Sequence, residues 1–228
     1  MELKEITNLY KDHPNTADFI NELENSRITK IHLRGLSGSS KSAFAALILT
    51  KIKGINLFIF SNKDEAAYFY NDIVNLLCDE NILFFPSSYK RSVQYNQTDN
   101  GNIILRTEVL NKLSSLNSEK KEMYSGLSIV SYPEALIEKV LLHNSIERYT
   151  LSLVKGEKTS IDSIYKIMGE YKYVQTDFVY EPGQFAIRGG IVDIFSYSNN
   201  LPYRIDFFGD EIESIRTFDV ETQLSKKQ

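Results

Sequence analysis

Cysteine is nearly absent from this chain of 228 residues, which contains one, Cys78, and tryptophan is missing altogether. A single cysteine excludes an internal disulfide framework and a zinc site built from several cysteines, so we expect a cytoplasmic protein. Cys78 itself falls late in an apolar helix pattern. That position predicts a small buried side chain rather than a nucleophile.

An excess of positive charge is also missing, because 26 Lys and Arg stand against 30 Asp and Glu, for a net charge of −4. Proteins that coat nucleic acid usually need a basic excess, so this balance argues against broad nucleic-acid binding. The sequence has no apolar run of about 18 residues that could cross a membrane, and no apolar signal segment at its start. With 42% hydrophobic residues, the composition is that of a globular protein without a membrane anchor.

The chain shows two different patterns of predicted secondary structure, one after the other. In the first, four apolar runs alternate with helical patterns, as in a parallel sheet whose strands are covered on both faces; the runs are residues 31–33, 55–60, 82–85 and 127–130. From about Tyr149, shorter strands separated by Gly, Pro and Asn turns indicate a smaller mixed α+β domain. We predict an α/β fold with domains over residues 1–149 and 150–228.

The second domain is expected to contain one helix and several strands. Residues 160–169 have a helical pattern that Thr159 or Ser160 can cap. The predicted strands are residues 151–154, 171–179, 185–195 and 202–208.

The segment Gly35–Ser42 (GLSGSSKS) follows the first predicted strand and opens a helix, which is the context of a phosphate-binding loop. That pattern requires Gly directly before the lysine, and here Ser40 stands there. The other predicted strands end at Ser61, Ser87 and Ser131 rather than at the Asp that helps an NTPase hold magnesium. A structural turn is therefore the leading interpretation, with anion binding and a working NTPase as alternatives. The positions in question are Gly35, Gly38, Ser40, Lys41 and Ser42.

A second motif places Arg188 directly before Gly189 and Gly190, between two apolar strand patterns. The glycines predict a bend or bulge that redirects the neighbouring side chain. Farther along, the alternation of residues 202–209 puts Arg204 and Phe208 on one face, and core residues on the other. An exposed Phe beside an exposed Arg has the composition of an interface hot spot. A structural corner followed by ordinary strand residues is the alternative interpretation.

No catalytic or metal site can be assembled from the sequence. The acidic residues between positions 206 and 221 alternate along predicted strands or lie in a turn, which indicates a solvated face. His13, His32 and His143 are far apart and lack partners at ligand spacing. We therefore predict no catalytic residue and no metal ligand.

The motifs around Arg188 and Arg204 carry a family resemblance. Residues 182–195 (PGQFAIRGGIVDIF) and 201–219 (LPYRIDFFGDEIESIRTFD) resemble the UvrB-homology module at the N-terminus of bacterial transcription-repair coupling factors, the Mfd family. The first 149 residues are similar to that module in layout, in the degenerate phosphate loop and in residues 85–87 and 129–134.

The resemblance implies a recruiting surface rather than a reaction. In this family the first domain is a helicase-like α/β fold that has lost its catalytic motifs, and the smaller domain docks the damage-recognition subunit UvrA. The family positions that contact UvrA fall on Arg188, Arg204 and Phe208. The ATP-driven DNA translocase motor and the RNA polymerase-binding domain of the family lie elsewhere. ATP and magnesium are therefore expected there, and no cofactor is expected in this fragment.

Two other functions remain as alternatives, a nucleotide hydrolase that uses the phosphate loop and a UvrB-like DNA clamp of an excision-repair helicase. UvrB clamps DNA with a hairpin rich in aromatic residues. The polar segment 89–102 has only Tyr89 and Tyr95 for stacking, so it is a weak candidate for such a hairpin.

Overall fold

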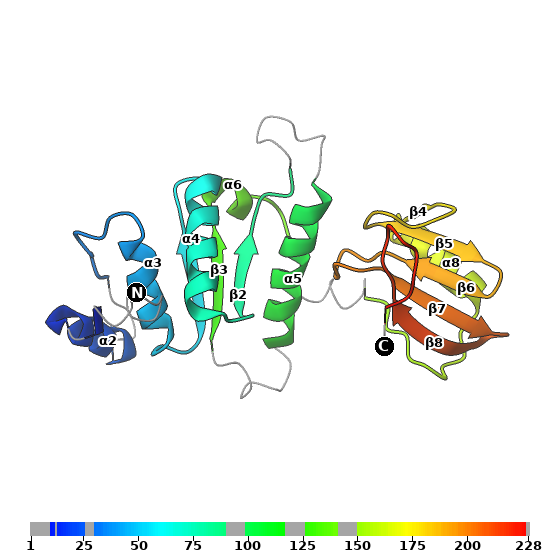
Figure 1. Ribbon diagram of the computed structural model, residues 1–228, viewed down its shortest axis with the longest axis horizontal. Coiled ribbons are helices and arrows are strands. Elements are labelled where there is room, and N and C mark those ends of the chain that lie inside the picture. Colours follow the sequence, from blue (N-terminus) through cyan, green and yellow to red (C-terminus); the bar gives the residue numbers. More distant parts are fainter. Residues whose placement is uncertain are drawn as a thin grey trace. The chain divides into compact units, whose positions relative to one another are not determined.

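The computed structural model describes residues 10–11, 13–25, 30–89, 99–116, 126–140 and 150–226. The chain divides into two compact units, Met1–Ser87 with Ser115–Glu138 and Ser88–Ser114 with Lys139–Gln228. The first unit holds a three-stranded sheet and the second a five-stranded sheet (Figure 1). The predicted α/β class is confirmed. The predicted boundary between residues 149 and 150 adjoins a segment outside the described residues and stays a prediction.

The described helices are α2 (Pro14–Asn25), α3 (Ser40–Leu49), α4 (Lys63–Leu77), α5 (Asn100–Leu116), α6 (Pro133–Leu136) and α8 (Ile161–Glu170). The strands are β1 (Ile55–Ile59), β2 (Ile82–Phe85), β3 (Leu127–Ser131), β4 (Val174–Gln175), β5 (Gln184–Arg188), β6 (Ile191–Ile194), β7 (Tyr203–Phe208) and β8 (Glu211–Thr217).

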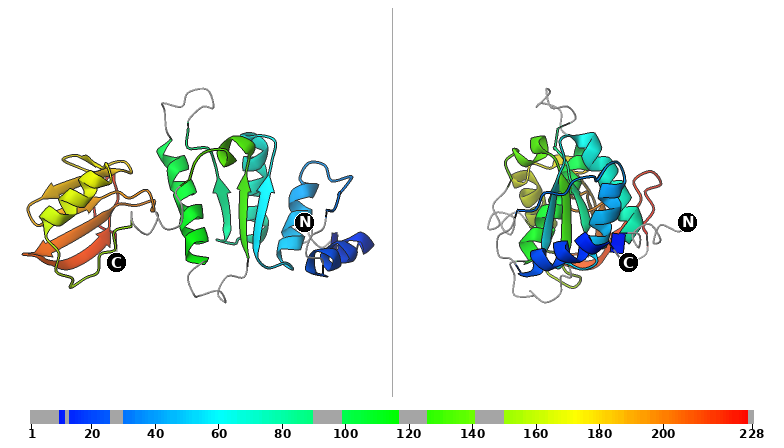
Figure 2. Two further views of the ribbon diagram at one scale, coloured as in Figure 1. Left: turned by 180° about the vertical axis from the view of Figure 1, so that it is seen from behind. Right: turned by 90° about the vertical axis from the view of Figure 1, so that its left-hand side faces the viewer.

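The sheet of the first unit is parallel throughout, with the strand order β1-β3-β2. Every residue of β2 and β3 is buried, as their apolar sequences predict. Helix α4 begins at a cap, because the side chain of Asn62 accepts a hydrogen bond from the amide of Glu65. This helix packs beside α3 and against β2 and β3, and the strands lie in front of it when seen from behind (Figure 2).

Strand β1 is less buried than its sequence predicts. Its side chains alternate between half-buried and exposed, and the exposed ones are Ile55, Leu57 and Ile59. Both β1 and β2 pair with β3 alone among the described strands, so the edge position is not the reason; Ile55, Leu57 and Ile59 share one side of β1 that the described residues leave uncovered. The expected coverage on both faces is therefore confirmed for β2 and β3 and is wrong for β1.

The predicted strand at residues 31–33 is wrong. Residues 30–34 form no strand, and Ile31 and Leu33 remain exposed. An apolar alternation becomes a strand only where a neighbour supplies hydrogen bonds, and no described strand pairs with this segment. The loop from Gly35 to Ser42 therefore follows irregular chain instead of a strand.

Cys78 is exposed, which contradicts the predicted buried position. The helix α4 ends at Leu77, and Cys78 forms its C-cap with a left-handed backbone, φ 51°. This turn takes the side chain off the apolar helix face that the sequence pattern had extended by one residue too many.

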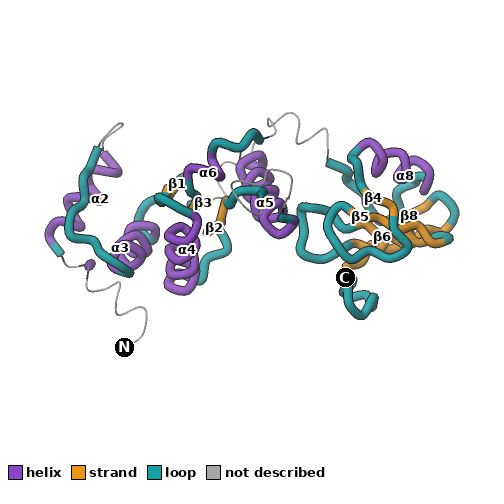
Figure 3. The backbone as a smooth tube through the Cα atoms, turned by 90° about the horizontal axis from the view of Figure 1, so that it is seen from above, coloured by secondary structure: helices purple, strands orange, loops and turns teal. Residues whose placement is uncertain are grey.

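The second unit has a mixed sheet in the order β4-β5-β6-β7-β8, parallel between β4 and β5 and antiparallel elsewhere. Helix α8 lies along one face of this sheet (Figure 3). Its predicted cap is confirmed, because the Ser160 hydroxyl accepts a hydrogen bond from the amide of Ser163 at 3.1 Å. The core between helix and sheet consists of Ile164, Met168, Phe185, Val192, Ile194, Ile205, Phe207 and Ile212.

Of the predicted strands in this unit, one is wrong and another is much shorter. Residues 151–154 form no strand, although Leu151 and Leu153 pack against the core. The chain pairs with β8 only later, where the amides of Gly156 and Thr159 donate to the carbonyls of Ile212 and Asp210. Of residues 171–179, only Val174–Gln175 form a strand.

Candidate functional site

The β5–β6 hairpin sets the position of Arg188. Arg188 pairs with Ile191, so Gly189 and Gly190 form a two-residue turn, and Gly189 has φ +59°. A Cβ on Gly190 would lie 3.0 Å from the carbonyl oxygen of Phe207 on β7. The close approach of β7 therefore requires glycine here, and the predicted bend is confirmed.

Strand alternation collects several polar side chains on the sheet face opposite the core that α8 covers. Asp193 on β6 lies directly across from Arg204 on β7, and Arg204 lies directly across from Arg216 on β8. We call this side of the sheet the outer face; its charged residues and its exposed aromatic residue are Arg188, Asp193, Arg204, Asp206, Phe208, Glu211 and Arg216.

Asp193 joins two of these arginines. Its Oδ1 accepts a hydrogen bond from Arg204 Nε at 2.8 Å, and its Oδ2 accepts one from Arg204 Nη2 at 2.9 Å. Oδ2 also accepts a hydrogen bond from Arg188 Nη2 at 2.5 Å. The side chain of Asp193 is fully buried, so its charge is stabilised by these guanidiniums in place of water.

Each guanidinium has further contacts that fix its place. The Cζ atom of Arg188 lies 4.9 Å from the ring centre of Phe178, and Arg188 Nη1 donates to the carbonyl of Asp177. The Cζ atom of Arg204 lies 4.4 Å from the ring centre of Phe218, and its Nη1 donates to the carbonyl of Gln223. The hydrogen bonds to Asp193 raise the pKa of Arg204 above its ordinary value, which keeps it charged.

A second ion pair extends the outer face toward β8. Arg216 Nη2 donates to Asp206 Oδ2, and the same oxygen accepts a hydrogen bond from the Ser214 hydroxyl. With this pair, three arginines face two aspartates, and Glu211, directly across from Phe208 on β8, adds a third carboxylate to the outer face.

Phe208 is the exposed aromatic residue of the outer face. It ends β7, and 82% of its surface is exposed. Ile205 and Phe207 point into the core, so the predicted assignment of the two strand faces is confirmed. A large exposed ring costs free energy in water unless a partner covers it, and it is a common anchor of protein interfaces.

The expectation that Arg204 is an exposed arginine is wrong. Its side chain is only 14% exposed, compared with 32% for Arg188. Arg204 is less exposed because its guanidinium donates hydrogen bonds to the buried carboxylate of Asp193 and lies against the sheet. An acidic residue within the apolar run Ile191–Ile194 is the sequence signal for such a buried partner, because a lone charge is too costly in a strand core.

The degenerate phosphate loop uses two of its amides and one hydroxyl within the protein. The amides of Ser40 and Lys41, which start α3, donate to the carbonyls of Ser37 and Gly38 within the turn. The hydroxyl of Ser42, which would face magnesium in a phosphate-binding loop, donates instead to Asp72 at 2.8 Å. Lys41 is exposed. This geometry favours the structural turn.

Among the residues that the structure describes, no group of three His, Cys, Asp or Glu side chains could hold a metal ion. His143, Tyr95 and most of the polar segment 89–102 lie outside the described residues. The described part of the chain has no helix with the length and hydrophobicity needed to span a membrane.

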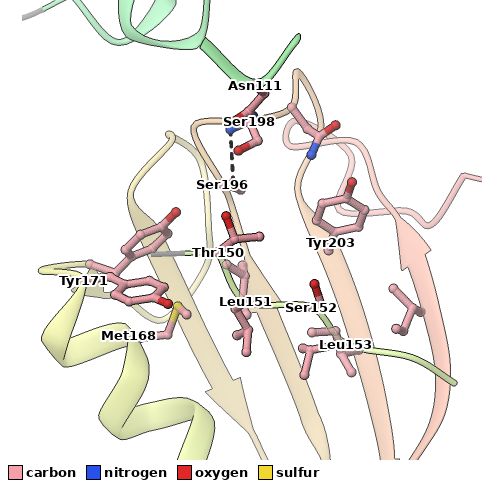
Figure 4. Close-up of a pocket in the computed structure, with 15 residues that line it drawn as sticks. Asn111, Thr150, Leu151, Ser152, Leu153, Met168, Tyr171, Ser196, Ser198 and Tyr203 are labelled. Atoms are coloured by element: carbon pink, nitrogen blue, oxygen red, sulfur yellow. Dashed lines mark hydrogen bonds between the residues drawn. The ribbon is translucent and has the colours of Figure 1, made fainter. Parts of the chain in front are cut away.

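A cavity of about 540 Å³ lies on the other face of the second sheet (Figure 4). Its walls include Met168, Tyr171 and Tyr203, and no charged side chain of the described residues lines it. Tyr173 also borders it, and burial raises the pKa of that phenol. The cavity therefore lacks the charged groups that the outer face has.

Comparisons with known proteins support the resemblance found in the sequence. Residues 151–228 match the family model of the UvrB interaction domain. The chain is 30% identical to the transcription-repair-coupling factor of Bacillus subtilis over 194 residues, which is 85% of this chain and 16% of that protein. It is 36% identical to the Escherichia coli protein of the same name over 106 residues, 46% of this chain and 9% of that protein.

The second unit thus contains a domain of the UvrB interaction family. UvrABC system protein B of Legionella pneumophila is 28% identical over 213 residues, 89% of this chain and 31% of that protein. Together these matches place the chain among the UvrB-homology modules of transcription-repair-coupling factors. The chain spans about 16% of the length of the first of these relatives.

Proposed function

We propose that this module recruits the excision-repair subunit UvrA, and that the outer face of the five-stranded sheet is the docking surface. The observation that carries the proposal is the arrangement of Phe208, Arg188 and Arg204 on one sheet face of a UvrB interaction domain. An exposed ring beside charged guanidiniums favours a partner that has an apolar pocket bordered by carboxylates.

The two arginines contribute differently in this proposal. Arg188 is about one third exposed and contacts the partner directly. Arg204 is mostly buried and contributes a smaller contact area, together with its charge. Phe208 supplies the exposed apolar area of the surface.

We further propose that the module is not catalytic and binds no cofactor of its own. The turn at Gly35–Ser42 uses the amides of Ser40 and Lys41 internally, and the Ser42 hydroxyl donates to Asp72, which disfavours a nucleotide hydrolase. The net charge of −4 disfavours a DNA clamp. Contacts with RNA polymerase and DNA, and the use of ATP and magnesium, belong to other parts of a longer protein in the cytoplasm.

The decisive experiment is a binding measurement between the purified chain and purified UvrA. Saturable binding in biolayer interferometry, weakened by Phe208→Ala and unchanged by Val154→Ala, supports the proposal. Val154 is a matched control because it is also an exposed apolar residue of the second unit. Equal binding by the unaltered chain and Phe208→Ala contradicts the proposed surface.

A further inference from the structure

Asp193 has no exposed atom through which to meet a partner, yet it contacts both arginines of the proposed docking surface. Its two oxygens accept three hydrogen bonds, two from Arg204 and one from Arg188. The register of strands β5, β6 and β7 explains how both arginines reach Asp193. Arg204 is directly opposite Asp193, whereas Arg188 reaches it diagonally from the neighbouring strand β5.

An arginine side chain on a surface normally samples many rotamers, and a partner that fixes one must overcome the lost entropy. Here the carboxylate and an aromatic ring hold each guanidinium before any partner arrives. Phe178 lies against Arg188, and Phe218 lies against Arg204. Two arginines placed side by side would also repel each other, and the shared carboxylate between them removes that repulsion.

The hydrogen bonds to Asp193 leave N–H donors on both arginines free to bind a partner. A guanidinium has five N–H bonds. In the described structure Arg188 uses one hydrogen on each of its Nη atoms, so Nε and one hydrogen on each Nη remain. Arg204 uses Nε and one hydrogen on each Nη, which leaves two hydrogens. Asp193 therefore orders both side chains without exhausting them.

We propose that Asp193 is a positioning residue of the docking surface, a buried carboxylate that holds Arg188 and Arg204 in the arrangement that UvrA binds. The role rests on the proposed function. It differs from a general charge effect, because Asp193 lowers the positive charge of the face and would by charge alone weaken binding to an acidic partner.

Asp206 provides the matched control. It is an aspartate on the same face and is paired with an arginine, but its partner is Arg216. Asp193→Asn and Asp206→Asn remove the same charge, and only the first removes charge-assisted hydrogen bonds to Arg188 and Arg204, whereas Asp206 acts on Arg204 through charge alone. We expect Asp193→Asn to weaken binding to UvrA by about tenfold or more, and Asp206→Asn to leave it within about twofold. Equal losses in the two variants overturn the proposal.

A single-variant background separates positioning from a general structural role. In a chain carrying Arg188→Ala, which leaves Asp193 paired with Arg204, Asp193→Asn should cause a smaller loss of affinity than in the unaltered chain, because one of its two targets is gone. An equal loss there, with the fold intact by circular dichroism, would mean that Asp193 does not position Arg188.

A measurement on the unaltered chain tests whether Arg188 and Arg204 are held in place, even if Asp193→Asn fails to fold. Side-chain nitrogen NMR reports rotation of each guanidinium about its Nε–Cζ bond. We expect slow rotation for Arg188 and Arg204 and fast rotation for the exposed Arg34. Fast rotation for all three overturns the positioning role alone. Absence of UvrA binding by the unaltered chain instead overturns the proposed function.

Discussion

Asp193 and Arg204 lie directly opposite each other on β6 and β7, and the fully buried carboxylate accepts two hydrogen bonds from that one guanidinium, at 2.8 and 2.9 Å. The paired geometry makes Arg204 both a surface residue and a part of the sheet's internal structure. Stability and binding should therefore respond differently to changes at Arg188, Arg204 and Phe208.

Arg204→Ala should destabilise the second unit. An exposed strand residue would contribute little to stability, but Arg204 is mostly buried. The substitution leaves Asp193 buried with one guanidinium in place of two, and removing one partner of a buried ion pair typically costs about 3 kcal/mol or more. Arg188→Ala should cost less, about 1 kcal/mol, because that side chain is partly solvated. Urea unfolding of the two variants checks the order, and equal costs would contradict it.

Phe208→Ala should separate binding from folding. With 82% of its surface exposed, Phe208 contributes little to the core, so the free energy of unfolding should change by less than about 0.5 kcal/mol. If it anchors UvrA, its truncation should cost about 2 kcal/mol or more of binding free energy, a loss of roughly 25-fold in affinity. A large drop in melting temperature would place Phe208 in the core after all.

Nucleotide chemistry should be absent from this chain. Because the amides of Ser40 and Lys41 are used within the turn, we expect no magnesium-dependent ATP hydrolysis, and the same background for Lys41→Ala. A phosphate-release assay on both proteins provides the measurement. Turnover that disappears in Lys41→Ala would refute the non-catalytic role, whereas weak phosphate binding at the start of α3 would not.

DNA binding should be weak and sensitive to salt. The net charge of −4 leaves no general basic excess to neutralise phosphates. Fluorescence anisotropy with duplex and single-stranded DNA should show binding that is lost between about 50 and 200 mM salt. Affinity that persists at the higher salt would favour the UvrB-like clamp.

The turn after Phe218 should lose stability in acid. The amide and hydroxyl of Thr222 and the amide of Glu221 donate to Asp219, and these hydrogen bonds lower its pKa below the ordinary value of 3.8. A lowered pKa in the folded state means that the stabilisation is present above the ordinary pKa and is lost as pH falls through the folded-state value.

The difference in melting temperature between the unaltered chain and Asp219→Ala should therefore be largest near neutral pH and should shrink in acid. The carboxyl carbon of Asp219, followed by NMR, should titrate with a midpoint below 3.8. A midpoint above 3.8 would mean that the turn does not retain these hydrogen bonds in solution.

Much of the second unit follows from local sequence. Alternation along residues 202–208 is enough to place Phe208 outside and Ile205 inside, because side chains of a strand point to opposite faces. Gly189 and Gly190 determine a tight turn, because Gly189 has φ +59° and the backbone of Gly190 passes close to the carbonyl of Phe207. Ser160 caps α8 by accepting a hydrogen bond from the amide of Ser163, only three residues farther along the chain.

Tertiary structure alone decided the rest, because the groups involved are distant in sequence or depend on a neighbour. Ile31 and Leu33 have a strand-like pattern but no described strand to pair with. Asp193 meets Arg188 and Arg204 only because three strands align in one register, and a slip of one residue would turn Asp193 toward the hydrophobic core. The sequence by itself determined that Arg204 and Phe208 share one strand face, and the register determined that Arg188 and Arg204 share a buried carboxylate.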